Sequence, residues 1–255
     1  MADPLLRVEN LVRRFGGVLA TDHLSLDVGQ GELHAIIGPN GAGKTTLISQ
    51  LTGQLFPNSG TIHFAGRDIT SLPAYRRSAL GLARSFQITS LLPDFTAADN
   101  VALAAQAHDG HSFRFWGNAR KESGLRNAAL SALKRVGLEH RADIVVSRLS
   151  HGEQRELELA VALATKPQLL LLDEPMAGLG TTESARMVQL LQELRREVTI
   201  VLVEHDMDAV FALADRITVL VYGRVIASGL PAAIRQNEEV KRAYLGEQHA
   251  VTRHG

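Results

Sequence analysis

The chain has 255 residues, of which 45% are hydrophobic, and its 27 Lys and Arg residues balance 27 Asp and Glu residues. This balance argues against the strongly basic surface of a nucleic-acid-binding protein, so no nucleic-acid partner is expected. No apolar run approaches the ~18 residues of a membrane span, and the absence of cysteine excludes disulfides, thiolate zinc sites and thiol catalysis. The N-terminus lacks a charged-then-apolar signal segment, so the sequence predicts a soluble, cytoplasmic globular protein.

Short apolar runs give the predicted strands. Two of them, Leu169–Leu172 and Ile200–Val203, are apolar without alternation, which is typical of strands covered on both faces. The early runs follow one another closely, with glycine turns such as 29–31, and indicate a small antiparallel section. We therefore expect an α/β fold with a mostly parallel sheet. In chain order, the predicted strands are Leu5–Val8, Leu24–Val28, Leu33–Ile37, Thr61–Phe64, Leu82–Phe86, Leu169–Leu172, Thr199–Val203 and Ile217–Val221.

The third strand leads into the segment GPNGAGKTT, which fills the pattern G-x-x-x-x-G-K-[ST]. Between an apolar strand and a helical stretch from Gly43 to Thr52, this is the setting of a phosphate-binding loop. Glycines let the backbone point N–H groups at phosphate oxygens, and the helix N-terminus adds its positive end. Lys44 supplies a charge for the β- and γ-phosphates, and Thr45 supplies a hydroxyl for Mg²⁺. The predicted nucleotide-binding residues here are Gly38, Pro39, Asn40, Gly41, Ala42, Gly43, Lys44, Thr45 and Thr46.

From Thr96 to Arg148 the sequence has no strong strand signal. A helical pattern runs from Ala119 to Val136, and the segment His108–Asn118 reads as a loop. We interpret this stretch as part of a helical subdomain, about 96–163, inserted into a single domain that spans 5–246. The tail 247–255 is expected to fray.

The segment LSHGEQ, 149–154, precedes a predicted helix at Glu153–Thr165. Ser150 and Glu153 have the spacing of a capping box, which needs no ligand to explain it. Alternatively, Ser150, the Gly152 N–H and the helix N-terminus hold a phosphate. The segment lies only one helix before the next motif, and this position favours the second interpretation.

The next motif is LLLLDEP, 169–175. Ligands of open α/β sheets lie beyond the carboxyl ends of the strands, so Asp173 and Glu174 are expected beside the nucleotide. Asp173 suits a role on the Mg²⁺ side, and Glu174 can polarise the attacking water. Pro175 helps to end the strand. The alternative is a strand that simply ends in two solvated acids, and pairing with the phosphate-binding loop disfavours it.

Together these motifs resemble the ATP-binding cassette ATPases of ABC transporters, and the resemblance covers nearly the whole chain. GPNGAGKTT matches the family's Walker A motif, LSHGEQ its signature and LLLLDEP its Walker B motif. Gln87 in ARSFQ matches the Q-loop glutamine, and His205 in VLVEHD matches the switch histidine. Phe15 lies where the family places an aromatic ring that stacks on adenine. The resemblance implies an enzyme that hydrolyses ATP with Mg²⁺ as its cofactor.

The resemblance also implies how two cassettes share the binding and hydrolysis of ATP. Two cassettes bind head to tail, and each ATP lies between Walker A of one and the signature of the other. Catalysis in such a site rests on positioning and electrostatics rather than on covalent chemistry. Ser150 and Gly152 join the Walker A residues and Phe15 as nucleotide contacts. The implied catalytic residues are Glu174, His205 and Gln87, and the implied metal ligands are Thr45, Gln87 and Asp173.

Two positions depart from the family pattern. The signature usually reads LSGGQ, and His151 replaces its first glycine, although Ser150 and Gly152 remain. After the small-residue turn that follows Walker B, the family usually carries Asp or Asn. Gly180 stands there and has no side chain to reach a partner subunit.

The SFQ segment, the insert containing FRFWGN, the EHDM stretch and the C-terminal VKRAYLG are similar to ATPase subunits of branched-chain amino-acid importers. The implied partners are a second cassette, identical or paralogous, two membrane permease subunits and, indirectly, a solute-binding protein. The chain is expected at the cytoplasmic face of the inner or plasma membrane, as a peripheral subunit. Docking is expected at the insert 96–148, together with the Gln87 loop. The insert contains Phe113, Phe115 and Trp116, which either anchor the partner or pack against the insert's own helices.

Other functions remain open at this point. Cassettes for urea or amides look similar, and an exporter cassette differs only in the sub-family features. A non-transport ABC ATPase would usually carry two cassettes or a long coiled coil, and the chain has neither. A non-hydrolysing nucleotide-binding module would lack Glu174 or His205, and both are present.

Overall fold

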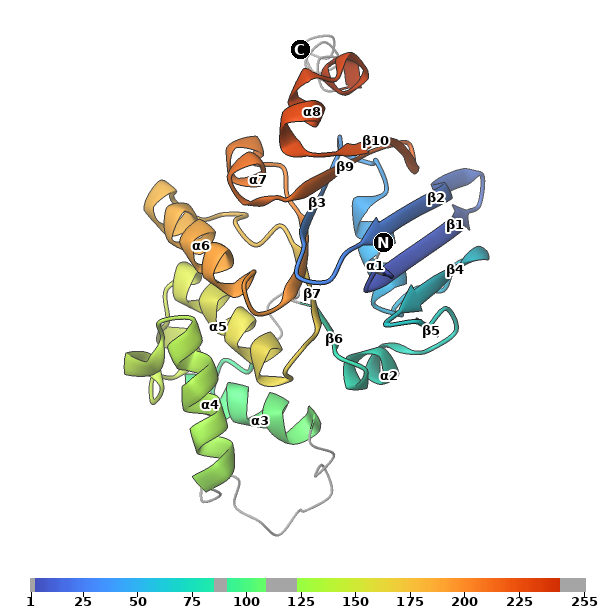
Figure 1. The fold of residues 1–255 in the computed structure, drawn as a ribbon. Coiled ribbons are helices and arrows are strands. Elements are labelled where there is room, and N and C mark those ends of the chain that lie inside the picture. Colours follow the sequence, from blue (N-terminus) through green and yellow to red (C-terminus); the bar gives the residue numbers. More distant parts are fainter. Residues whose placement is uncertain (1–2, 85–90, 109–122, 244–255) are drawn as a thin grey trace. The chain divides into compact units, whose positions relative to one another are not determined.

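The computed structural model describes residues 3–84, 91–108 and 123–243 (Figure 1). The chain forms two compact units. The first unit combines residues 1–77 with 194–255, and the second comprises residues 78–193. The boundaries of the predicted single domain, 5–246, and of the helical subdomain, 96–163, stay predictions.

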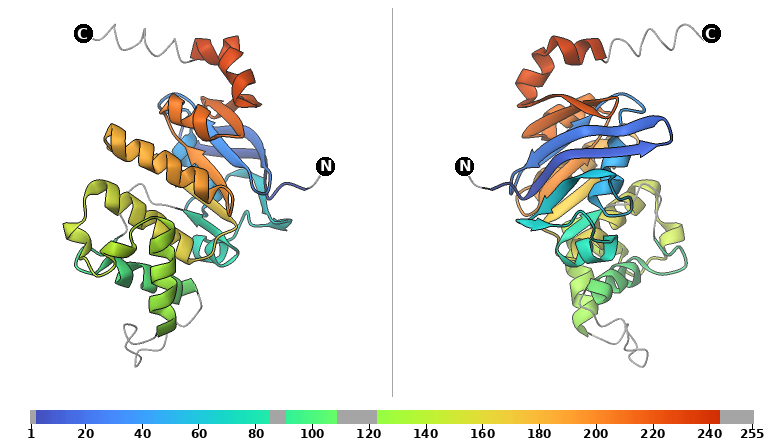
Figure 2. Two further views of the ribbon diagram at one scale, coloured as in Figure 1. Left: turned by 60° about the vertical axis from the view of Figure 1, so that its left-hand side comes forward. Right: turned by 90° about the vertical axis from the view of Figure 1, so that its right-hand side faces the viewer.

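The first unit contains a four-stranded antiparallel sheet in the order β2-β1-β4-β5 (Figure 2, right). In β2, buried Leu24, Leu26 and Val28 alternate with exposed residues, which is the period expected when one face of a sheet is covered. The predicted antiparallel section is therefore confirmed, although β1 and β2 are longer than their apolar runs and β5 carries no apolar signal. The strands are β1 (Leu6–Phe15), β2 (Val18–Val28), β4 (Ser59–Phe64) and β5 (Arg67–Asp68).

Four further strands of the first unit are β3 (Leu33–Ile37), β8 (Thr199–Val203), β9 (Arg216–Val221) and β10 (Arg224–Gly229). β3 pairs in parallel with β8 and β9, and β9 pairs with β10 in antiparallel fashion. Every residue of β8 is buried, so the prediction that Ile200–Val203 is covered on both faces is confirmed. Every residue of β3 is buried as well. The turn at 29–31 joins β2 to β3, which lie in different sheets. The turn therefore leads out of the predicted antiparallel section rather than joining two of its strands.

Helices cover these strands. α7 and α8 lie beside β9 and β10 (Figure 1), and Val210 and Ile234 contribute to a buried cluster with Ala35, Ile37 and Val219. Asp206 caps α7 by accepting hydrogen bonds from the backbone of its first turn. The helices of this unit are α1 (Lys44–Leu51), α7 (Met207–Leu213) and α8 (Pro231–Gln236), and α2 (Ala74–Ala79) crosses its boundary.

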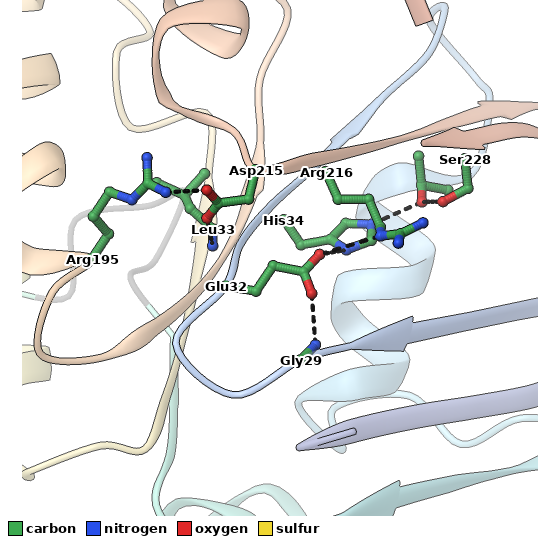
Figure 3. A network of polar contacts seen from close by, with 9 residues as sticks. Gly29, Glu32, Leu33, His34, Arg195, Asp215, Arg216 and Ser228 are labelled. Atoms are coloured by element: carbon green, nitrogen blue, oxygen red, sulfur yellow. Dashed lines mark hydrogen bonds and ion pairs between the residues drawn. The ribbon is translucent and has the colours of Figure 1, made fainter. Parts of the chain in front are cut away.

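A network of polar contacts joins β3 to β9 and β10 (Figure 3). The Glu32 carboxylate accepts hydrogen bonds from the Gly29 N–H at 2.8 Å and from Nδ1 of the fully buried His34 at 2.9 Å. Nε2 of His34 bonds to the Thr218 hydroxyl at 2.8 Å, and that hydroxyl bonds to Ser228 at 2.9 Å. The buried imidazole therefore has both ring nitrogens satisfied, as a buried polar group requires.

The second unit contains β6 (Leu82–Arg84) and β7 (Leu169–Asp173), which pair in parallel. Helices α3, α4 and α5 pack against one another in this unit (Figure 2, left). The described part of the insert is helical, as predicted, with one isolated bridge between Thr96 and Val145. The helices of the second unit are α3 (Ala97–His108), α4 (Ser123–Arg135), α5 (His151–Ala164) and α6 (Thr181–Leu194, which ends at the unit boundary), with short 3-10 turns at Glu139–Arg141 and Val146–Arg148.

Candidate active site

The predicted phosphate-binding loop follows β3, and α1 begins directly after it at Lys44. Three glycines of the loop have positive φ angles, 154° at Gly38, 76° at Gly41 and 102° at Gly43. A Cβ added at Gly43 would lie 2.2 Å from the Ala20 carbonyl oxygen, and one at Gly38 would lie 2.1 Å from the Leu220 carbonyl oxygen. The backbone therefore requires glycine at both positions, because no side chain fits between the loop and its neighbours.

A turn between β9 and β10 holds the loop from one side. The Gly223 N–H donates to the Ala42 carbonyl at 2.9 Å, and the Asp22 N–H donates to the Gly223 carbonyl at 2.9 Å. Arg224 then pairs with Asp22 at 2.6 Å. This support for the loop comes from residues nearly 200 positions away in the chain, and sequence motifs gave no signal for it.

Lys44 curls back over the loop it follows. It is 8% exposed, and its Nζ donates to the Gly38 carbonyl at 2.6 Å and to the Pro39 carbonyl at 3.0 Å. The Thr45 residue beside it is exposed. A cationic Nζ within the curve of the loop, next to a helix N-terminus, is the arrangement that attracts phosphate groups.

Two other predicted residues belong to the first unit. Phe15 ends β1 and is 48% exposed, and the Arg13 guanidinium lies 4.8 Å from its ring centroid. His205 follows β8 with an exposed side chain, and its backbone N–H donates to the buried Glu204 carboxylate at 2.9 Å. Both side chains are accessible to a ligand, as stacking on a base or contact with a phosphate requires.

In the second unit, β7 delivers two carboxylates in succession. The Asp173 side chain is 1% exposed, and its Oδ2 accepts a hydrogen bond from the Arg84 guanidinium at 3.0 Å. Glu174 has a φ of 51°, which residues other than glycine rarely adopt. Such strain costs about 1–3 kcal/mol and gathers at functional sites, where the surrounding structure holds it in place.

The predicted signature segment begins α5. Ser150 is the N-cap, and it forms a capping box in which its Oγ accepts from the Glu153 N–H at 3.3 Å and the Glu153 carboxylate accepts from the Ser150 N–H at 2.8 Å. The capping interpretation is therefore confirmed. Ser150 is also exposed, so a role in ligand binding stays a prediction.

The two departures from the family pattern lie close together. Glu183 in α6 accepts a hydrogen bond from the Gly180 N–H at 3.1 Å. A Cβ at Gly152 would lie 2.7 Å from the Glu183 Oε1, and one at Gly178 would lie 3.4 Å from Cε1 of His151. The turn after β7 therefore contacts the start of α5 through Glu183 and His151. Glu183 was missed by sequence reasoning.

The structure groups the predicted residues by unit. Phe15, the loop 38–46 and His205 belong to the first unit. Ser150, Gly152 and the pair Asp173–Glu174 belong to the second. Gln87, Phe113, Phe115 and Trp116 lie outside the described residues.

The donors present suit Mg²⁺, which prefers oxygen ligands and is commonly bound by one carboxylate together with substrate phosphates. Asp173 offers a buried carboxylate and Thr45 an exposed hydroxyl. Within the described ranges, no group of three or more His, Cys, Asp or Glu residues is placed to hold a metal by itself. The residues therefore fit a metal ion that arrives with a nucleotide.

Arg84 is a second residue that sequence reasoning missed. It is the last described residue of β6, and its side chain is only 10% exposed. An arginine at the end of an apolar strand, in LARSFQ, is the signal that could have drawn attention to it.

In the described part of the chain, no helix is long and apolar enough to cross a membrane.

Comparison with known proteins agrees with these motifs. A family model described as "ABC transporter" matches residues 21–177, and one described as "Branched-chain amino acid ATP-binding cassette transporter" matches residues 224–250. The high-affinity branched-chain amino acid transport ATP-binding protein LivG of Salmonella typhimurium is 41% identical over 255 residues, covering 97% of this chain and 100% of LivG. The corresponding protein BraF of Pseudomonas aeruginosa is 38% identical, with 97% and 100% covered.

A solved structure gives the same result for the fold. An ATP-binding cassette of an ABC transporter, determined in its ADP conformation, is similar with a TM-score of 0.86 at 29% identity, covering 96% of this chain and 100% of that one. Family model, relatives and fold all agree with the three motifs. The chain therefore belongs to the ABC transporter family, as one of its ATP-binding cassette ATPases.

Proposed function

We propose that this chain is the ATP-hydrolysing subunit of an importer for branched-chain amino acids. The observation that carries the proposal is its similarity, over nearly its full length, to two proteins named for branched-chain amino acid transport. The sub-family model at residues 224–250 adds independent support, because it lies outside the nucleotide motifs that all cassettes share.

The proposed nucleotide site uses the phosphate-binding loop 38–46. Its N–H groups, the N-terminus of α1 and the Lys44 ammonium would bind the phosphate chain. The exposed Phe15 ring would stack on adenine. The exposed Ser150 hydroxyl and the Gly152 N–H would contact the nucleotide of a second cassette.

Thr45, Asp173 and Gln87 would hold Mg²⁺. The ion would supply positive charge that neutralises the β- and γ-phosphate oxygens. Glu174 would orient the attacking water and accept its proton, and its place directly after the buried end of β7 supports such a role. The exposed His205 would contact the γ-phosphate.

We also propose that two cassettes, identical or paralogous, act together on two membrane permease subunits, with a solute-binding protein delivering the solute. The chain would then lie at the cytoplasmic face of the membrane as a peripheral subunit. Leu92, Phe95 and Leu103, at or near the start of the insert, are large apolar residues that are each about two-fifths exposed. They support docking through this region, because such exposed apolar side chains often serve interfaces.

The test is reconstitution with candidate permeases in vesicles. ATP-driven uptake of leucine, isoleucine and valine should depend on this chain and should be lost with the Glu174→Gln variant. Urea and a short amide serve as competing solutes. Uptake of urea without uptake of any branched-chain amino acid would reject the proposed substrate and retain the transport ATPase. If no solute is taken up in response to ATP, and ATPase activity is the same with and without permeases, a non-transport ATPase is favoured.

A further inference from the structure

The ion pair between Arg84 and Asp173 joins the ends of two neighbouring strands. β6 and β7 pair in parallel, with Arg84 opposite Leu171, so the guanidinium reaches along β7 toward the residue that ends it. Its terminal nitrogen donates to the Asp173 Oδ2 at 3.0 Å. Both side chains are at least nine-tenths buried.

Burial makes this pair consequential. A carboxylate removed from water is strongly disfavoured unless a positive charge and hydrogen bonds accompany it. Arg84 supplies both to Asp173, and its pre-organised planar guanidinium holds the carboxylate in one orientation. Removing one partner of such a pair leaves the other as a buried charge with less compensation.

The same carboxylate is the proposed ligand of Mg²⁺, and the inference that follows rests on that proposed function. We propose that Arg84 is a positioning residue that serves Asp173 as its counter-ion when no metal is bound and competes with Mg²⁺ for it. A divalent ion that approaches Asp173 also approaches the guanidinium, and the two positive charges repel each other across a poorly screened interior. Arg84 thereby lowers the affinity of the site for metal while it keeps the carboxylate aligned.

The test measures how much Mg²⁺ contributes to nucleotide binding. The dissociation constant of a non-hydrolysable ATP analogue is determined twice, in EDTA and in saturating Mg²⁺. The value in EDTA divided by the value in Mg²⁺ gives the metal contribution. Arg84→Gln should raise this ratio roughly tenfold, within the usual range of coupling between two bound ligands. A merely structural role would weaken binding in both conditions and leave the ratio unchanged.

Arg155→Gln is the matched control. Arg155 pairs with Glu158 at 3.0 Å within α5, both side chains of this pair are buried to a similar degree, and neither residue is a proposed metal ligand. This variant should keep the wild-type ratio. Arg84→Lys provides a second variant if Arg84→Gln fails to fold, because it keeps the charge but lacks the planar fork. Its ratio should rise less than that of Arg84→Gln, in the same direction.

The outcomes separate this inference from the function on which it rests. Asp173→Asn should bring the ratio close to one, and the double variant with Arg84→Gln should match it. If Asp173→Asn keeps the wild-type ratio, Asp173 is not a metal ligand and the proposed function of that residue fails. If Asp173→Asn lowers the ratio but both Arg84 variants keep or lower it, the competition between Arg84 and Mg²⁺ is rejected.

Discussion

Glu174 is the residue on which hydrolysis should depend most. Glu174 follows directly after the buried end of β7 and has a left-handed backbone, with φ 51°. Its carboxyl group therefore lies at the junction between the strand and the turn. Glu174→Gln preserves shape but cannot accept a proton. We expect Mg-ATP binding to persist while turnover falls roughly 10²–10⁴-fold, the usual contribution of a positioned base.

The measurement is steady-state phosphate release beside equilibrium nucleotide binding, with the dimer followed by size-exclusion chromatography. ATP should hold the variant as a dimer, because hydrolysis no longer reopens it. Turnover close to that of the wild type would remove Glu174 from its assigned role. Loss of nucleotide binding would instead point to a local folding defect.

Gly43 and Gly41 offer a second comparison at single-residue scale. Both have positive φ, so alanine at either position carries a backbone penalty of about 1–2 kcal/mol. A Cβ at Gly41 meets no atom within 4 Å, whereas one at Gly43 meets the Ala20 carbonyl at 2.2 Å. Gly43→Ala should therefore destabilise the chain by about 1–3 kcal/mol more than Gly41→Ala.

Urea unfolding in the absence of nucleotide measures this difference. Equal losses for the two variants would show that β2 moves away from the loop without resistance. That result would contradict the close support that the structure gives to Gly43.

Among the elements, the start of α5 has two separable tasks. The Ser150 Oγ caps the helix, whereas the His151 ring lies near Gly178 in the turn after β7. Ser150→Ala should cost about 1 kcal/mol of stability through the lost cap and weaken ATP-driven dimerisation further. His151→Gly should leave ATPase activity largely intact, because the hydroxyl that caps α5 belongs to Ser150 and the His151 ring lies near Gly178.

Both variants are compared by ATPase activity and by the ATP concentration that produces half-maximal dimer. The roles are reversed if His151→Gly abolishes hydrolysis and Ser150→Ala does not.

The elements also show how far sequence reasoning reaches. β3 and β8 were predicted to the residue, because both are buried throughout and all but one residue of each is apolar. β10 was missed, because its residues are only partly buried and include Arg224 and Ser228. The capping box at Ser150 was visible because both of its partners lie within one turn.

Contacts between distant segments were the part that could not be predicted. Glu183 contacts Gly152 and Arg84 contacts Asp173, and neither partner lies within the motif of the other. A motif records which residue types a ligand needs nearby. It does not record which charges elsewhere in the chain hold those residues in place.

At the scale of the whole molecule, each unit contains a glutamate with a shifted pKa, and the two shifts have opposite signs. They therefore change the free energy of unfolding with pH in opposite directions. Burial pushes the pKa of Glu32 upward, but hydrogen bonds from His34 and the Gly29 N–H outweigh it, so the pKa lies below its ordinary 4.5. Burial raises the pKa of Glu156 above 4.5 despite the opposing charge of Arg186. The first shift contributes stability that is present above the ordinary pKa and is lost as pH falls below it.

The second shift has the opposite sign, because stability is lost as pH rises from 4.5 through the raised pKa of Glu156. Relative to wild type, Glu32→Gln should therefore be most destabilised near neutral pH and approach wild type in acid. Glu156→Gln should improve relative to wild type as pH rises from about 4 to about 7. Urea midpoints across this range test both signs, and parallel pH profiles for all three proteins would contradict them.

The hydrogen bond from the Gly223 N–H to the Ala42 carbonyl has a consequence for the order in which the phosphate-binding loop and its support are made during synthesis. The ribosome makes the loop among the first fifty residues, yet its supporting turn is made only after residue 220. Domains that fold as they emerge generally do so from the N-terminus, but this contact requires residue 223, which is made 181 residues after Ala42. A nascent chain therefore carries its nucleotide motif before the hydrogen bond from Gly223 to Ala42 can form.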